Sequence, residues 1–251
     1  MKKVIVAHRG LSNHYPENTL IAFQKAFQTK ANFIECDVYL SKDGVPVVIH
    51  DRDLKRTTTG TGYVDEQPLS ELKSYSAGYP QKFGKKFSDE KIPVLSEVLD
   101  LVANHSIGIL IEIKAWGPPY KSKSAASYNA KVGPVVYEYV LKKYSKLKDR
   151  MVFISFDQAI LQSIRQLDAS IRLGPIFFEL PAHGSMADVA LHLKTDLVIF
   201  NKTLLKMPSA FDKTNRVWHI VYTVLPSEFE QMERYDELTG FATNDADLAG
   251  C

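Results

Sequence analysis

The sequence lacks the features that mark several large classes of protein. It has two cysteines among 251 residues, Cys36 and Cys251, too few and too far apart for a disulfide framework or a thiolate metal site. Lysine and arginine (31) nearly balance aspartate and glutamate (29), for a net charge of +2. This balance argues against nucleic acid as a partner. No apolar run approaches the ~20 residues of a membrane helix, so we expect no stable membrane insertion.

The N-terminal segment does not fit the pattern of a secretion signal. Basic Met1–Lys3 precedes only four apolar residues, Val4–Ala7, before His8–Gly10 interrupts. A signal peptide needs an apolar stretch of ~7–15 residues. We therefore expect a soluble, cytoplasmic protein that begins with its first strand. Hydrophobic residues make up 45% and charged residues 24%, which is typical of a globular chain, and the oligomeric state is not predicted.

Short β-branched segments alternate with helical patterns along the chain. Apolar residues recur at helical spacing after residue 18 and in 95–102, 132–140, 160–167, 186–193 and 226–235. Eight β units, each followed by a helix or a shorter connector, favour a (β/α)8 TIM barrel over the alternative, a doubly wound open sheet. We expect one domain over residues 1–251. The predicted strands are Val4–Ala7, Phe33–Val38, Ile107–Ile113, Met151–Ser155, Ile171–Ile176, Asp196–Phe200, Val217–Thr223 and Gly240–Thr243.

The region after the second strand breaks this alternation. Asp43-Gly44 stands between two apolar segments, the second being Val45–His50, which predicts a tight hairpin. Residues 45–92 show no clean helical pattern, and Thr57–Gly62 is rich in turn formers. We predict a small insertion here, capping the C-terminal face of the barrel, because the βα loops emerge at that face.

Three acidic residues lie within apolar strands. Glu35 and Asp37 flank Cys36 in a predicted strand, so both side chains point to the same face. A divalent cation that prefers oxygen ligands would relieve the repulsion between the two carboxylates. The alternative is that both are solvated acids at the surface. Glu112 interrupts an isoleucine-rich strand two residues before Lys114, which fits a third cation ligand or a buried Glu–Lys ion pair.

Two histidines lie where strands are expected to end. His8 closes the first strand beside Arg9, whose guanidinium suits phosphate, and His50 ends the hairpin strand, which should return it to Asp37. A lone histidine is more often structural, but two of them beside an arginine and three acids favour acid–base catalysis. His219, within an apolar strand, is expected to belong to the core.

Taken in order, these motifs resemble those of the glycerophosphodiester phosphodiesterase family. The resemblance is densest in the first 115 residues. It rests on His8-Arg9-Gly10, Pro16-Glu17-Asn18-Thr19, Glu35-x-Asp37, the run 41–51, the run 56–62, the run 92–99, Glu112-Ile113-Lys114 and Ser155-Phe156-Asp157.

The resemblance implies a TIM barrel with a small insertion, one divalent cation (Mg²⁺ or Ca²⁺) and hydrolysis of glycerophosphodiesters to sn-glycerol 3-phosphate and an alcohol. Carried over by position, it implies metal ligands, an acid–base pair and phosphate contacts. Tyr222 is a further expected substrate contact, where the family commonly has tryptophan. The implied metal ligands are Glu35, Asp37 and Glu112, the acid–base pair is His8 and His50, and the phosphate contacts are Arg9 and Lys114.

The C-terminal part departs from the family pattern, which bears on the alcohol pocket more than on the phosphate chemistry. Leu225 stands at a position where the family commonly has asparagine, and 243–246 matches the family's Thr-Asp-x-Pro loosely. The loop 115–124 is expected to be either a lid or a solvated crossing. Alternative functions are a lysophospholipase D or a cyclising phospholipase on the same barrel, a non-catalytic barrel that binds a phosphorylated ligand, and a sugar-phosphate isomerase.

Overall fold

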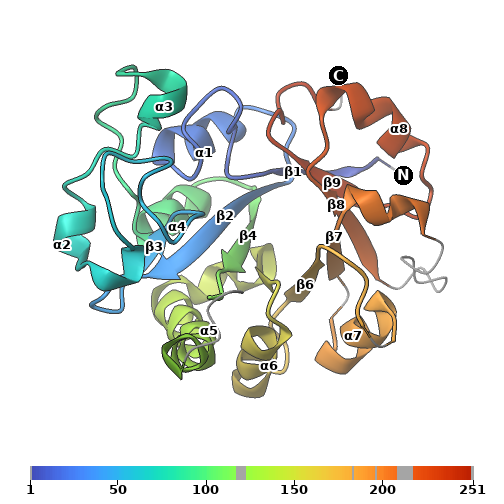
Figure 1. Cartoon of the computed structure of the whole chain (residues 1–251). Coiled ribbons are helices and arrows are strands. Elements are labelled where there is room, and N and C mark those ends of the chain that lie inside the picture. The colour runs from blue at the N-terminus through green and yellow to red at the C-terminus, as the bar shows by residue number, and fades with distance from the viewer. Residues whose placement is uncertain (1, 117–122, 183, 196, 208–216, 250–251) are drawn as a thin grey trace.

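Eight parallel strands close into a barrel in the computed structural model, which describes residues 2–116, 123–182, 184–195, 197–207 and 217–249 (Figure 1). The strands follow the order β1-β9-β8-β7-β6-β5-β4-β2, and β2 pairs with β1 to complete the circle. The predicted (β/α)8 TIM barrel is confirmed. Its strands are β1 (Val4–Ala7), β2 (Phe33–Leu40), β4 (Gly108–Ile113), β5 (Met151–Ser155), β6 (Leu173–Phe177), β7 (Leu197–Asn201), β8 (Trp218–Tyr222) and β9 (Gly240–Thr243).

The strands are apolar on both faces because both faces are buried. One set of side chains, including Leu110, Ile154 and Ile199, fills the barrel interior. The residues between them, such as Ile111 and Phe153, join the larger core beneath the helices. The almost unbroken hydrophobicity of the strands therefore follows from their position between two apolar layers.

Helices cover the outside of the barrel where the apolar spacing predicts them. Thr19 and Asp157 accept hydrogen bonds from the first turns of α1 and α6, which sets where these helices begin. Helix α5 begins nine residues before the predicted start at Val132, in a segment rich in alanine and serine that lacks an apolar stripe. The longer helices are α1 (Leu20–Ala26), α4 (Leu95–Ala103), α5 (Lys123–Tyr144), α6 (Gln158–Leu167), α7 (Met186–Leu193) and α8 (Phe229–Glu233).

The predicted hairpin follows β2. Strand β3 (Pro46–Val48) runs antiparallel to β2, with Val38 opposite Val48, and Gly44 supplies the positive φ (+78°) that the turn requires. The chain then forms only short elements, which share a small apolar cluster around Leu54, Leu72 and Ile92. These elements are η1 (Val64–Glu66), α2 (Leu69–Leu72) and α3 (Pro80–Phe83), and the last two lie at the left of Figure 1. The predicted extent of the insertion, 45–92, and its capping role stay predictions.

In the described part of the chain, further 3₁₀ helices connect strands and α-helices. They are η2 (Ser145–Arg150), η3 (Lys202–Lys206) and η5 (Pro226–Glu228). Among the described residues, we find no helix that combines the length and the apolar character needed to cross a bilayer.

The pairing of β1 with β9, the first and last strands of the barrel, depends on a glycine. Gly240 stands opposite Val4, and a Cβ at this position would overlap the Val4 carbonyl oxygen and lie 2.7 Å from the Val4 Cβ. We expect Gly240→Ala to lower the free energy of unfolding by about 2 kcal/mol or more, because backbone atoms would have to separate. Denaturant unfolding measures this. Leu191→Ala, on the exposed face of α7, is the control and should change stability little; an unchanged midpoint for Gly240→Ala would contradict the expectation.

Candidate active site

The turn after β1 places two predicted site residues beside β2. Arg9 and Gly10 both have positive φ angles, +57° and +80°. Gly10 packs so closely that a Cβ would lie 2.7 Å from the backbone of Ala22, which explains why glycine is needed there. This turn directs the Arg9 backbone N–H at Glu35, whose Oε2 accepts a hydrogen bond of 2.9 Å. The His-Arg-Gly motif is thus a local structure that links the first two strands.

The three predicted carboxylates meet inside the barrel mouth. Glu35 and Asp37 lie on the same face of β2, and the parallel register sets Asp37 directly opposite Glu112 on β4. Each offers an oxygen within 4.8 Å of the oxygens of the other two, and all three residues are buried. The alternative of solvated surface acids is therefore excluded for Glu35 and Asp37.

Two basic side chains neutralise part of this charge. Lys114 Nζ lies 2.6 Å from Glu112 Oε1 and 3.3 Å from Asp37 Oδ1, and Arg9 Nε lies 3.2 Å from Asp37 Oδ2. Burial opposes ionisation of Asp37, but Lys114 and Arg9 outweigh it and lower the pKa of this carboxyl. The predicted Glu112–Lys114 ion pair is present, and it coexists with the carboxylate cluster rather than replacing it.

Of the three carboxyl groups, Glu35 is the one that no cationic side chain pairs with directly in the contacts given above. Burial raises its pKa well above the usual range, and Asp37 and Glu112 add repulsion. Its Oε1 is buried without a hydrogen-bond partner. A buried, unpartnered carboxylate oxygen beside two other carboxylates fits a divalent cation with hard oxygen ligands, so these three residues could hold one.

Both predicted catalytic histidines open into the same cavity. His8 Nδ1 lies 2.8 Å from Asn244 Oδ1, and His50 Nδ1 lies 2.6 Å from Asp51 Oδ1. Burial lowers the pKa of His8 to about 3, and the positive charge of Arg9 contributes to the shift. His8 is therefore neutral at neutral pH, while Asp51 supports a proton on Nδ1 of His50.

The cavity has a charged side and an apolar side. Its volume is about 580 Å³, including the part open to solvent. The charged lining comes from the segments at β1, β2, β3 and β4, and it comprises His8, Arg9, Glu35, His50, Glu112 and Lys114. Isoleucines of β5, β6, β7 and β8 contribute most of the apolar lining, and Phe156 and Tyr222 face each other edge-on with ring centroids 6.2 Å apart. Tyr222, a predicted substrate contact, thus lines the cavity.

Several residues that organise this site have no role predicted from the sequence. Asn18 donates to Asp37 Oδ2 at 2.7 Å and accepts from the Asp37 backbone at 3.2 Å, holding that carboxylate in place. Glu17 accepts a hydrogen bond from Arg9 at 2.9 Å. Both belong to the Pro16–Thr19 motif, so the motif itself was the available signal. The contact of Asn244 with His8 could not be predicted from local sequence, because it joins residues 236 positions apart.

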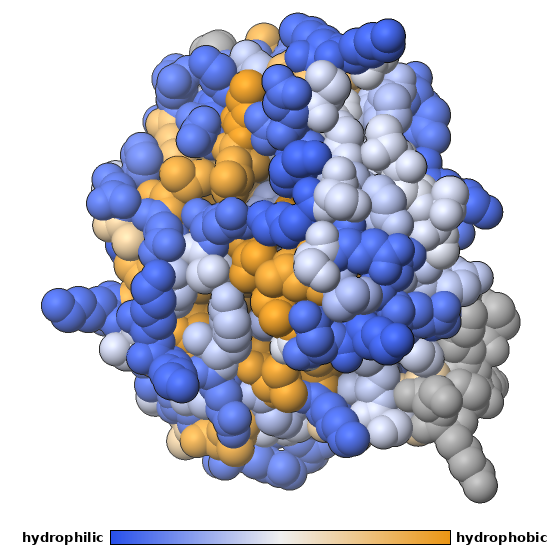
Figure 2. Space-filling model, turned by 90° about the vertical axis from the view of Figure 1, so that its left-hand side faces the viewer, coloured by the Kyte–Doolittle hydropathy of each residue, from blue (hydrophilic) through white to orange (hydrophobic). Residues whose placement is uncertain are grey.

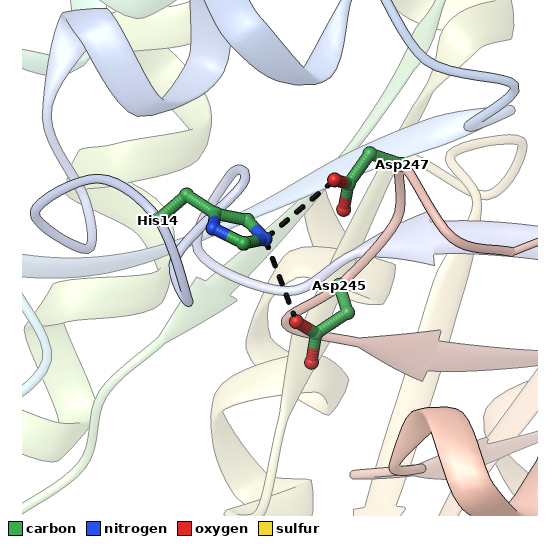
Figure 3. Close-up of side chains that lie close together, drawn as sticks. All are labelled: His14, Asp245 and Asp247. Carbon is green, nitrogen blue, oxygen red and sulfur yellow. Dashed lines mark ion pairs between the residues drawn. The ribbon is translucent and has the colours of Figure 1, made fainter.

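A second group of possible cation ligands joins the first and last loops of the barrel. His14 Nε2 lies 3.8 Å from Asp245 Oδ1 and 3.5 Å from Asp247 Oδ2 (Figure 3). Asp245 also accepts a hydrogen bond from Asn13 at 2.5 Å. His14 and Asp247 are exposed, so solvent can screen this charge without a cation.

The remaining predictions concern residues away from the cavity. His219 is buried, and its ring packs edge-on against Phe200, in agreement with the expected place in the core. Most of the loop considered as a lid, residues 117–122, lies outside the described residues, as does Cys251.

Comparison with known proteins identifies the family of this chain. Residues 8–238 match the model of the glycerophosphoryl diester phosphodiesterase family. A glycerophosphodiester phosphodiesterase of Caldanaerobacter subterraneus is 36% identical over 179 residues, covering 70% of this chain and 68% of the relative. One from Bacillus subtilis is 34% identical over 194 residues, covering 74% and 63%.

Solved structures agree with these relatives. The Oleispira antarctica phosphodiesterase in complex with the product sn-glycerol-3-phosphate superposes with a TM-score of 0.82 at 26% identity, covering 98% of this chain and 94% of the other. The family match includes all three carboxylate residues and both histidines. The chain therefore belongs to the glycerophosphoryl diester phosphodiesterase family of enzymes.

Proposed function

We propose that the chain hydrolyses glycerophosphodiesters to sn-glycerol 3-phosphate and an alcohol. In this proposal His8 and His50 are the acid–base pair, and Arg9, Lys114 and Tyr222 contact the substrate. Glu35, Asp37 and Glu112 hold one divalent cation, Mg²⁺ or Ca²⁺. The observation that carries the proposal is that two imidazoles line the same cavity as Glu35 and Glu112, two members of the buried carboxylate cluster. The cytoplasmic location expected from the sequence stays a prediction.

The charge of the cavity suits an anionic phosphodiester. Arg9 and Lys114 present donors to the cavity, and they are held ionised by the carboxylates beside them. A bound dication would supply further stabilisation of negative charge on the phosphoryl oxygens. The two side chains then orient the phosphate by directional hydrogen bonds, which a point charge alone does not provide.

The two histidines have different surroundings, which assigns them different roles in the proposal. His8 is neutral and accepts a proton from the nucleophile. The second role is assigned to His50, whose Nδ1 lies 2.6 Å from Asp51 Oδ1: it donates a proton to the departing alcohol oxygen. We favour a route in which the glycerol 2-hydroxyl attacks phosphorus and water then opens the cyclic phosphate. A substrate analogue without that hydroxyl would be turned over only by direct attack of water.

Removal of either imidazole tests the proposed roles. We expect His8→Ala and His50→Ala each to lower kcat on glycerophosphocholine by about 10²–10⁴-fold, because each removes one proton transfer. His192→Ala, on the exposed face of α7, is the matched control and should keep normal activity. Release of sn-glycerol 3-phosphate measures the rate. Normal turnover in either cavity variant contradicts its role, and an inactive wild-type protein that binds the substrate would favour the non-catalytic alternative.

Removal of one carboxylate charge tests the cation site. In cation-free protein we expect Glu35→Gln to leave the melting temperature unchanged or raised, because the amide replaces an acidic group that is buried beside two other carboxylates and has one oxygen without a hydrogen-bond partner. Saturating Mg²⁺ or Ca²⁺ should stabilise the wild type by about 2.7 kcal/mol at one hundred times the Kd, and the variant much less. Thermal unfolding with EDTA or with cation measures both effects, and Glu230→Gln, an exposed acid, is the control. Equal cation effects in all three proteins would contradict the site.

A second candidate function, lysophospholipase D activity, is favoured by exposed apolar side chains. Phe156, Phe178, Leu225 and Leu248 are each between 45% and 67% exposed, and they follow β5, β6, β8 and β9 in turn. The βα loops of a barrel emerge at one face, and Phe156 continues into the cavity. The face that carries α2 and α3 has an apolar area surrounded by hydrophilic residues (Figure 2). Such a surface suits the acyl chain of a lysophospholipid.

Comparison of two substrates distinguishes the two functions. If lysophospholipids are substrates, Phe178→Ser should raise the KM for lysophosphatidylcholine several-fold and leave the KM for glycerophosphocholine unchanged. Only lysophosphatidylcholine has an acyl chain that can lose its contact with Phe178. Leu191→Ser, equally exposed but on α7, is the control. No turnover of lysophosphatidylcholine by the wild type would exclude this second function.

A further inference from the structure

An unbroken series of charged contacts links His50 to Arg9 through the segment after β3. His50 Nδ1 lies 2.6 Å from Asp51 Oδ1, and the other oxygen of Asp51 accepts from Arg56 Nε at 2.5 Å. The two terminal nitrogens of Arg56 donate to the two oxygens of Glu17, each at 2.8 Å. Glu17 Oε1 also accepts from Arg9 at 2.9 Å. One guanidinium therefore lies midway between two groups that the proposed reaction uses.

Arg56 does not itself reach the reaction cavity. The cavity is lined by His50 and Arg9 but not by Arg56, Asp51 or Glu17. Arg56 is about one-third exposed, on the outer side of these contacts. Any influence on the substrate must therefore pass through the residues that it binds.

The geometry of these contacts requires arginine. All three nitrogens of Arg56 are engaged by two carboxylates from different loops, and its guanidinium lies 5.5 Å from the ring centroid of Tyr79. A lysine ammonium is a single point of charge and cannot form a bidentate contact with one carboxylate while reaching a second in this fixed plane. The hydrogen bond from Arg56 also helps to keep Glu17 ionised, since it lowers the pKa that burial would raise.

Each of the two branches fixes a different functional group. On one side, an ionised Asp51 holds the Nδ1 proton of His50, which leaves Nε2 as the nitrogen that can exchange a proton with substrate. On the other side, Glu17 draws the Arg9 side chain toward one position, while Asp37 lies 3.2 Å from its Nε. The first branch bears on proton transfer and the second on phosphate binding.

We propose that Arg56 is a positioning residue that sets the orientation of His50 through Asp51 and of Arg9 through Glu17. The inference rests on the proposed function, in which His50 transfers a proton and Arg9 contacts phosphate. It adds that a single guanidinium outside the cavity coordinates both groups. The two branches are separable, because Asp51 and Glu17 do not contact each other except through Arg56 in the contacts described above.

Kinetics of the full-length, cation-saturated protein on glycerophosphocholine separate the branches. We expect Asp51→Asn to lower kcat with little change in KM, and Glu17→Gln chiefly to raise KM. Arg56→Ala should show both effects, with kcat reduced about 10–100-fold, as for other displaced supporting groups. Added methylguanidinium should restore part of the loss in Arg56→Ala, whereas Arg56→Lys should stay impaired.

Arg52→Ala controls for general damage to this segment. Arg52 makes a similar two-pronged contact with Asp65, at 2.6 and 3.0 Å, but has no contact with Asp51 or Glu17 among the hydrogen bonds described. We expect Arg52→Ala to lower stability without changing kcat and KM together, and added methylguanidinium should not restore any loss. Normal kinetics in Arg56→Ala, or a loss that methylguanidinium does not restore and that Arg52→Ala reproduces, overturns the proposal.

Two measurements that need no turnover keep this test independent of the proposed reaction. Nitrogen-15 NMR of the His50 ring reports the Nδ1–H tautomer, and calorimetry reports the Kd of sn-glycerol 3-phosphate. We expect Arg56→Ala to lower the population of that tautomer and to weaken binding of the phosphate. If the wild type hydrolyses no glycerophosphodiester but both changes occur, the proposed function fails and the positioning role stands; if neither changes, the positioning role fails.

Discussion

The arrangement of charge at the barrel mouth depends on three carboxylates buried within 4.8 Å of one another. Carboxylates so placed repel one another strongly, because the interior of a protein screens charge far less than water does. The two nearby cations, Arg9 and Lys114, both contact Asp37, so they compensate it more fully than they compensate Glu35. The negative charge of the three carboxylates is therefore only partly compensated, and a further positive charge would be stabilised at the barrel mouth.

The barrel separates this charge from an apolar wall. Strands β1, β2 and β4 and the hairpin strand β3 bring the acids, the bases and both histidines, whereas β5 to β8 contribute isoleucines, Phe156 and Tyr222. A phosphodiester has the same division when its alcohol is apolar, since the phosphate is charged and the alcohol is not. The side chains of the charged half are joined by many hydrogen bonds and ion pairs, and they belong to the motifs that this chain shares with the family. The apolar half includes Tyr222, where the family commonly has tryptophan, and the second departure from the family pattern, Leu225, follows β8 and is exposed.

The loops around the mouth are held by ion pairs as well as by packing. Arg56 joins the segment after β3 to the loop after β1, and the contact of His8 with Asn244 joins the first strand to the last. Such contacts are directional, so they fix side-chain orientation more closely than apolar packing does. A site built on the ends of separate strands needs this kind of bracing, because each strand positions only its own residues.

Local pattern alone determined much of this protein. Alternation in β2 put Glu35 and Asp37 on one face, β-branched segments marked all eight barrel strands, and Asp43-Gly44 marked the hairpin, since each depends on neighbours within a few residues. Only the tertiary structure decided that Asp37 stands opposite Glu112, that Asn244 meets His8, and that Arg56 reaches Glu17. These pairs are separated by many residues, and their contact depends on barrel register and loop path, which local propensity does not encode.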